Sequence, residues 1–267
     1  MQLENSLQHL MFWQREKDAR RHAREKASAL ASLLRAYSGS RIKKVGPRPE
    51  KRVVLYEMEN CPHSRRVREA LSVLDLDVDV RPCPRGESHH RHELSSIGGR
   101  EQIPMLVDPN SMEVLYEADT IIDYLFRTYG TGKPTWALRL PILSNLSSRL
   151  ASRVRKNAGT EFRAARRRPE LPLELWSYEA CPEARLVREV LSEHALPYTL
   201  HNAAHGSLKR AALVSDAGSD HMPHLYDPDR KVRTTGAGNI VAYLRDTYGP
   251  EPQAASTEQR EPSWAAA

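Results

Sequence analysis

An internal repeat constrains the fold of this 267-residue chain more than any other feature. The segment Leu55–Ser72 reappears at Leu175–Ser192, with an offset of 120 residues. Further along the offset becomes 119, where Pro104 corresponds to Pro223 and the Asp-Pro pair that follows is also repeated. Self-similarity over such a length indicates a tandem duplication of a unit of roughly 80 residues.

Both units have the same order of predicted elements, which is clearest in the first. The pattern predicts a strand at 53–56, a helix that begins at Pro62, a strand at 78–80, a polar helix at about 88–97, and strands at 103–107 and 113–116. A closing helix then places four apolar residues on its inner face: Ile121, Ile122, Leu125 and Phe126. This βαβ–αββα order is that of the thioredoxin fold, with a Cys-Pro pair at the start of the first helix.

Several motifs in this order carry a family resemblance: Cys61–Ser64, Val80–Gly86, Gln102–Pro109 and Tyr116–Leu125. Both units resemble the glutaredoxin-like N-terminal domain of glutathione S-transferases, and the tandem arrangement resembles a family of double-domain proteins of plants and bacteria. The resemblance implies an α/β protein with two tandem thioredoxin-like domains and added basic amphipathic helices. A full transferase continues into a large all-helical domain. Here 41 residues separate the units and 18 follow the second, so we do not expect a conventional transferase.

The expected division of the chain is a basic helical extension (1–51), a first domain with an active-type site (52–130), a basic amphipathic linker (131–171), a second domain with a degenerate site (172–249) and a disordered tail (250–267). Residues 1–52 carry 13 basic and 5 acidic side chains, and residues 131–171 carry 10 and 2, whereas residues 53–130 and 172–267 together carry 17 and 27. Because the expected folded units are acidic, nucleic acid is an unlikely partner. Peripheral membrane contact through the basic helices stays open, but their packing against the domains is favoured.

The apolar positions of these basic helices define the faces that we expect to be buried. In the extension they include Leu3, Leu7, Leu10, Met11, Ala27, Leu30, Leu33, Leu34 and Tyr37, and in the linker Leu143, Leu146, Leu150 and Val154. The first twenty residues lack the apolar core of a signal peptide, and three cysteines cannot form a disulfide framework. We therefore expect a cytoplasmic protein with reduced thiols.

Cys61 is the residue that we expect to carry the chemistry. It precedes the proline that would open the first helix, where unpaired N–H groups and the helix dipole stabilise a thiolate. The thiolate is the form that attacks disulfides, and the alternative is a buried, inert cysteine. Position 64 is a serine, which excludes a two-cysteine exchange within the motif. The resemblance implies a monothiol glutaredoxin-like site, at which a glutathione mixed disulfide forms and a second glutathione resolves it.

Two further segments complete the glutathione site that the resemblance implies. In the families, the proline at position 104 is cis and the preceding residue offers backbone hydrogen bonds to the cysteinyl part of glutathione. An acid and a small hydroxyl residue at the start of the last helix hold the γ-glutamyl group, but here the hydroxyl is replaced by Ala118. The alternatives are an ordinary trans proline at a strand start and a helix start stabilised by acids. The glutathione-binding residues so implied are Pro62, Ser64, Ile103, Pro104, Glu117, Ala118 and Asp119.

The second copy of the site is expected to be degenerate. It keeps four residues of the pattern: Cys181, Pro182, Met222 and Pro223. Both acids at the start of the last helix are lost in Gly236-Ala237-Gly238, and Glu183 places a negative charge beside the cysteine, which opposes a thiolate. A structural or docking role is favoured over catalysis here.

Cys83 is a second thiol to consider in the first unit. A helical crossover makes the first two strands parallel, so Cys61 and Cys83, which follow their ends, are expected at one edge of the sheet. This placement predicts that Cys83 serves as a resolving thiol. The alternative is a half-buried loop cysteine without a partner.

The leading hypothesis is a glutathione-binding thiol oxidoreductase, with glutathione as co-substrate and a glutathionylated protein or small disulfide as substrate. The alternatives are a glutathione-conjugating transferase and a non-catalytic glutathione-sensing or scaffold protein. No resident metal is expected. Iron–sulfur binding with glutathione, known in related monothiol proteins, is not required by any residue of the chain.

Overall fold

The computed structural model describes residues 23–30, 32–33, 39–43, 45–87, 89–134, 138, 158–217 and 220–250. The first unit contains β1 (Val53–Glu57), α2 (Pro62–Val73), β2 (Val78–Pro82), α3 (His89–Gly98), β3 (Met105–Asp108), β4 (Glu113–Tyr116) and α4 (Ala118–Tyr129). The second contains β5 (Leu173–Ser177), α7 (Pro182–Glu193), β6 (Tyr198–Asn202), α8 (Lys209–Ala217), β7 (His224–Asp227), β8 (Val232–Thr235) and α9 (Ala237–Tyr248). The predicted thioredoxin-like order is therefore confirmed in both copies.

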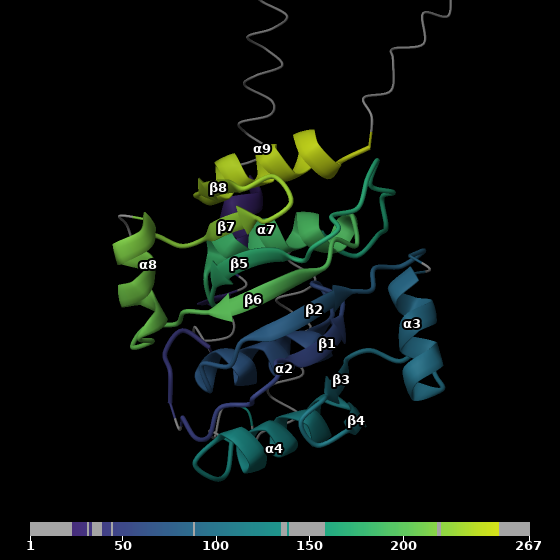
Figure 1. The fold of residues 1–267 in the computed structure, drawn as a ribbon, viewed down its shortest axis with the longest axis vertical. Coiled ribbons are helices and arrows are strands. Elements are labelled where there is room, and N and C mark those ends of the chain that lie inside the picture. Colours follow the sequence, from purple (N-terminus) through teal and green to yellow (C-terminus); the bar gives the residue numbers. More distant parts are fainter. Residues whose placement is uncertain are drawn as a thin grey trace, which may run out of the picture.

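The two units share one eight-stranded mixed sheet, in the order β4-β3-β1-β2-β6-β5-β7-β8 (Figure 1). The junction is the antiparallel pair of β2 and β6, in which Asp79 lies opposite Thr199. These two residues are repeat counterparts, so a local twofold axis passes between them. The Thr199 hydroxyl also donates to the Asp79 carboxylate at 2.7 Å. In a single unit, β2 or its counterpart β6 would be an edge strand. The duplication pairs these two strands with each other, so neither is left as an exposed edge.

Helices cover both faces of this sheet. On one face α2, α4, α7 and α9 enclose a continuous apolar core that includes Leu55, Phe126, Leu175 and Leu244 from both units. On the other face α3 covers a smaller cluster with Leu94, and α8 covers another in the second unit. Because a strand alternates its side chains between the two faces, β1 places Leu55 in the larger core and Tyr56 in the smaller cluster under α3. The two predicted tandem thioredoxin-like units therefore share one sheet and a common core.

The N-terminal extension packs against the second unit, but not through the predicted apolar face. Residues 23–30 and 32–33 are helical, and within them Leu30 and Leu33 are 44% and 61% exposed. Ser28 and Ser32 are buried instead, and their hydroxyls donate to backbone carbonyls at the start of α7 at 2.7 and 2.9 Å. Short hydroxyl side chains allow this close approach and satisfy the carbonyls. The expectation of a leucine-lined contact was wrong for these residues.

Several sequence predictions fall on residues outside the described part of the chain. They concern the apolar positions of 1–22, the linker positions Leu143, Leu146, Leu150 and Val154, and the tail from 251 to 267. Within the described residues, no helix combines the length and the apolar character that a membrane crossing requires.

Candidate functional site

Cys61 is the N-cap residue of α2, immediately before Pro62 at the first helical position. Its backbone is extended, its N–H donates to Met58 at 2.9 Å and its carbonyl accepts from Arg65 at 3.1 Å. The residue is 7% exposed. The turn between β1 and α2 therefore holds the thiol at the end of the helix where backbone N–H groups are unpaired, as the sequence predicted.

Two polar contacts link the three segments of the first unit that the family resemblance assigned to a glutathione site. Gln102, two residues before the cis Ile103-Pro104 bond, donates to the Glu117 carboxylate at the start of α4. Arg66, one turn into α2, donates to the carboxylate of Asp119. The proline loop, the start of α4 and the first turns of α2 are thereby linked.

The remaining predicted residues of this site differ in accessibility. Glu117 and Asp119 are exposed, with 55% of the Asp119 side chain open to solvent, whereas Ala118 and Ser64 are buried. The Ser64 hydroxyl has no hydrogen-bond partner among the described residues. Arg66, fully buried, was not predicted as part of the site. A cation one turn along the helix from the cysteine, facing an acid at the next helix start, is the signal that would have identified it.

In the second unit, a cavity of about 680 Å³ lies beside Cys181. It is lined by Met222 of the second cis X-Pro bond, by the start of α9 and by Glu25 and Ala29 of the N-terminal helix. The Cys181 thiol accepts a hydrogen bond from the Ala184 N–H at 3.4 Å, yet burial raises the pKa of this thiol above its ordinary value. Burial is a larger effect than the neighbouring Glu183 carboxylate, which the sequence argument had stressed.

Cys83 follows β2 and lies at the same sheet edge as the Cys61 turn, because β1 and β2 are parallel with Glu57 opposite Pro82. It is fully buried beneath α3, next to Tyr56, Leu94 and Met105, and its thiol donates to the Arg81 carbonyl at 3.4 Å. Burial raises the pKa of Cys83 far above its ordinary value. All three cysteines are free thiols.

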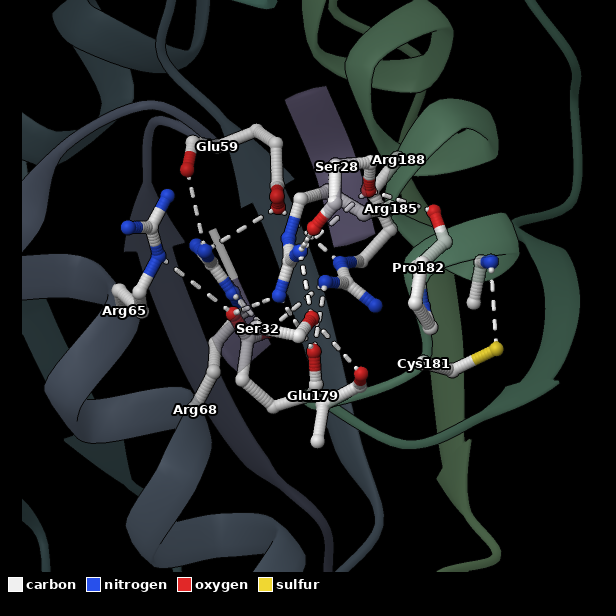
Figure 2. Close-up of polar contacts among 12 residues, drawn as sticks. Ser28, Ser32, Glu59, Arg65, Arg68, Glu179, Cys181, Pro182, Arg185 and Arg188 are labelled. Atoms are coloured by element: carbon white, nitrogen blue, oxygen red, sulfur yellow. Dashed lines mark hydrogen bonds and ion pairs between the residues drawn. The ribbon is translucent and has the colours of Figure 1, made fainter. Parts of the chain in front are cut away.

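A buried network of arginines and glutamates, here called the arginine–glutamate network, joins the two units; Figure 2 shows most of its members and Cys181. It consists of Arg65, Arg68, Arg185, Arg188, Glu57, Glu59 and Glu179, each at most 2% exposed. Arg68 of the first unit donates to Glu179 of the second at 2.8 Å, and Arg188 of the second donates to Glu59 of the first at 3.0 Å. These residues are repeat counterparts, so each unit supplies the same contact to the other.

The pKa values of two acids in the arginine–glutamate network are shifted in opposite directions. Burial alone would raise the pKa of Glu179, but the guanidinium groups of Arg188 and Arg68 outweigh it and hold that pKa far below its usual range. Burial raises the pKa of Glu57 to about 7, and the nearby Glu59 adds to the effect while Arg68 opposes it. Glu59 and Glu179 stand two residues before Cys61 and Cys181, so the network fixes both turns.

The sequence patterns considered above did not identify this network, because they gave no role to the charged residues of the two helices that follow the cysteines. One available signal was that Arg65, Arg68 and Glu59 recur together as Arg185, Arg188 and Glu179. A second was that the repeat extends further back than the units predicted. Residues 28–40 match 148–160 at six positions, including both buried serines of the N-terminal helix and Gly39. That conserved spacing marks the helix before β1 as part of the repeated unit.

The βαβ–αββα order, the Cys-Pro pair at a helix start and the cis proline define a glutaredoxin-like class of thioredoxin fold. The sequence model of the glutathione S-transferase N-terminal domain matches residues 55–134 and 175–252, and the chain belongs to this family. None of the curated proteins compared with the chain matches it.

Two solved structures show similarity to parts of the chain. One is the glutathione transferase BmGSTD1 of Bombyx mori, with 28% identity, 32% of this chain covered and a TM-score of 0.27. The alignment covers 38% of the length of that transferase. The other is Leishmania TDR1, described as a unique trimeric glutathione transferase, with 13% identity and a TM-score of 0.28. That alignment covers 74% of this chain and 67% of the other.

Proposed function

We propose that this protein is a glutathione-dependent thiol oxidoreductase whose nucleophile is Cys61. The observation that supports the proposal best is the linkage of three segments in the first unit. The helix start that bears Cys61, the cis Ile103-Pro104 loop and the acids at the start of α4 are connected through Arg66–Asp119 and Gln102–Glu117. Membership of the glutathione S-transferase N-terminal domain family makes glutathione the expected thiol.

The proposed reaction is a pair of thiol–disulfide exchanges. The Cys61 thiolate attacks the glutathione sulfur of a mixed disulfide, the disulfide bond breaks, and the substrate leaves as a thiolate that takes a proton from water. A second glutathione thiolate then attacks the Cys61–glutathione disulfide, which forms oxidised glutathione and restores the Cys61 thiolate. Ser64 occupies the position of a second motif cysteine, so this resolving step uses an external thiol.

The start of α4 is the proposed anchor for the γ-glutamyl end of glutathione. Glu117 and Asp119 are exposed acids that complement its ammonium group, and the free N–H groups of the first turn suit its carboxylate. Arg66 holds the Asp119 carboxylate in position from α2. The Ile103 backbone, Pro62 and Ser64 complete the proposed site. The second unit has Gly236 and Gly238 in place of the two acids, so we propose one glutathione per chain.

Turnover of a mixed disulfide of glutathione and 2-mercaptoethanol tests the proposal on the full chain. Replacement of Cys61 with serine should abolish turnover, whereas the matched Cys181→Ser variant should retain it. Equal losses in both variants, or full activity in Cys61→Ser, would overturn the proposal. A resolving role for Cys83 has its own test, which is peptide mapping after diamide treatment. A Cys61–Cys83 disulfide supports that role, and Cys61–glutathione adducts with Cys83 always free oppose it.

A second candidate function is the binding of a small molecule in the second unit. The cavity beside Cys181 has the volume of a ligand pocket, and the N-terminal helix supplies a wall of the kind that a transferase builds from its helical domain. If the protein conjugates glutathione to an aromatic electrophile and this activity persists in Cys61→Ser, the result would favour a glutathione transferase over a thiol oxidoreductase. Binding of the electrophile without turnover would favour a scaffold or sensor.

A further inference from the structure

The start of α3 carries a cluster of metal-ligating side chains that the proposed reaction does not use. One donor atom each from His89, His90 and Glu93 lies within 4.8 Å of the other two. Tetrahedral Zn²⁺ with bonds near 2.1 Å needs donor atoms about 3.4 Å apart. A modest side-chain rotation would bring the three donor atoms to this separation. His89 is exposed and free to make that rotation, while His90 is buried and Glu93 is half-buried.

The orientation of His90 is the one that metal-binding histidines require. Its Nδ1 lies 2.7 Å from the Pro82 carbonyl oxygen, at the end of β2. A carbonyl only accepts hydrogen bonds, so Nδ1 carries the proton and Nε2 keeps its lone pair. A backbone carbonyl in this role commonly fixes the ring of a ligating histidine and increases its basicity. Glu93 lies beside the Tyr56 hydroxyl, which orients the carboxylate in turn.

The charges around the cluster favour a cation despite its place at a helix start. The buried Glu87 carboxylate accepts from the backbone N–H groups of His89, His90 and Arg91 at 2.5 to 3.2 Å, which offsets the positive end of the helix. A cavity of about 490 Å³ beside the histidines is also lined by Glu93 and Glu170. Two cations oppose these acids: Arg81 lines the same cavity, and Arg168 lies 3.5 Å from Glu87.

We propose that His89, His90 and Glu93 bind a divalent transition metal ion, with Zn²⁺ as the best match. Two imidazoles and one carboxylate form a borderline donor set that suits zinc better than magnesium or calcium. Three protein ligands leave the fourth tetrahedral position to water. At the corresponding positions, the second unit has Leu208, Lys209 and Ala212, and none of these residue types ligates zinc. The site therefore belongs to the first unit alone, and one ion binds per chain.

Calorimetric titration of the tag-free full chain with Zn²⁺ tests this site. A Co²⁺ titration followed by visible absorption reports the coordination geometry. We expect one ion per chain and a tetrahedral Co²⁺ spectrum without a thiolate charge-transfer band. His89→Gln and Glu93→Gln should each weaken Zn²⁺ binding at least tenfold. His89 is exposed, so its variant should fold normally, which circular dichroism verifies.

The matched control is His92→Gln, which removes an exposed imidazole from the same helix outside the donor cluster. Its affinity for Zn²⁺ should stay within twofold of the wild type. Absence of Zn²⁺ binding, equal affinity in the His89 and His92 variants, or a thiolate-to-cobalt band would each overturn the proposal. Because the readout is metal binding, its outcome is independent of whether Cys61 is catalytic.

Discussion

Replacement of Arg188 with methionine tests whether the arginine–glutamate network holds the two units together. Arg188 lies in α7 of the second unit and is 1% exposed. It donates to Glu59 of the first unit at 3.0 Å and to Glu179 of its own unit at 2.8 Å. Methionine keeps most of the side-chain volume but removes the charge, which leaves three buried carboxylates with fewer cations.

The expected loss in the free energy of unfolding is about 3 kcal/mol, at the lower end of the roughly 3–5 kcal/mol found when one partner of a buried ion pair is removed. The lower end applies because Glu59 and Glu179, the two partners of Arg188, each keep Arg68 as a second cation. Arg68 lies 3.2 Å from Glu59 and 2.8 Å from Glu179. Urea denaturation followed by far-ultraviolet circular dichroism measures this loss. A single transition is expected in both proteins, because the core is continuous across the units.

Arg52→Met is the matched control, because it removes an arginine–carboxylate contact on the surface. Arg52 donates to Asp79 at 2.8 Å with its side chain 50% exposed, so its removal should cost less than about 1 kcal/mol. A loss for Arg188→Met as small as that for Arg52→Met would show that the network does not hold the units together. A double-mutant cycle with Glu59→Gln isolates the coupling energy across the unit boundary.

Three further outcomes are expected. Because folding raises the Glu57 pKa from 4.5 to about 7, its contribution to stability is present at low pH and lost as the pH rises to about 7. In urea titrations, the free energy of unfolding of the wild type minus that of Glu57→Gln should therefore fall between about pH 5 and pH 7. A rise in this difference would contradict the raised pKa of Glu57. The Cys181 thiol, whose pKa is raised by burial, should react with limiting iodoacetamide more slowly than Cys61, and mass spectrometry showing the reverse order would be contrary. Asp119→Asn should weaken glutathione binding to the full chain about tenfold in calorimetry, whereas unchanged affinity would remove the start of α4 from the site.

The elements of each unit followed from sequence because local signals agreed with the tertiary structure. The prolines at positions 62 and 182 mark helix starts, and the inner face predicted for α4 is buried as expected. The joining of the units did not follow. The pairing of β2 with β6 is a contact between strands of different units. The apolar pattern of residues 78–80 predicts a strand, but it does not specify which strand pairs with it.

The buried charges show a second limit of sequence reasoning. Arg68 and Arg188 have the spacing and composition of a solvated helix face, and only the duplicated fold places them where no water reaches. The serines of the N-terminal helix were likewise overlooked in favour of Leu30 and Leu33. Hydrophobic periodicity identifies apolar contacts only, and this contact is made by hydrogen bonds. In both cases partner atoms lie more than 100 residues away in the sequence.

The most direct test of the central claim is to map glutathione adducts on the full chain after incubation with a glutathione mixed disulfide in the absence of free glutathione. Trapping the first exchange in this way reports the nucleophile itself. We expect one adduct per chain, located by peptide mass spectrometry on Cys61 and released by added glutathione. An adduct on Cys181, or no adduct on Cys61 under conditions in which the protein stays folded, would contradict it.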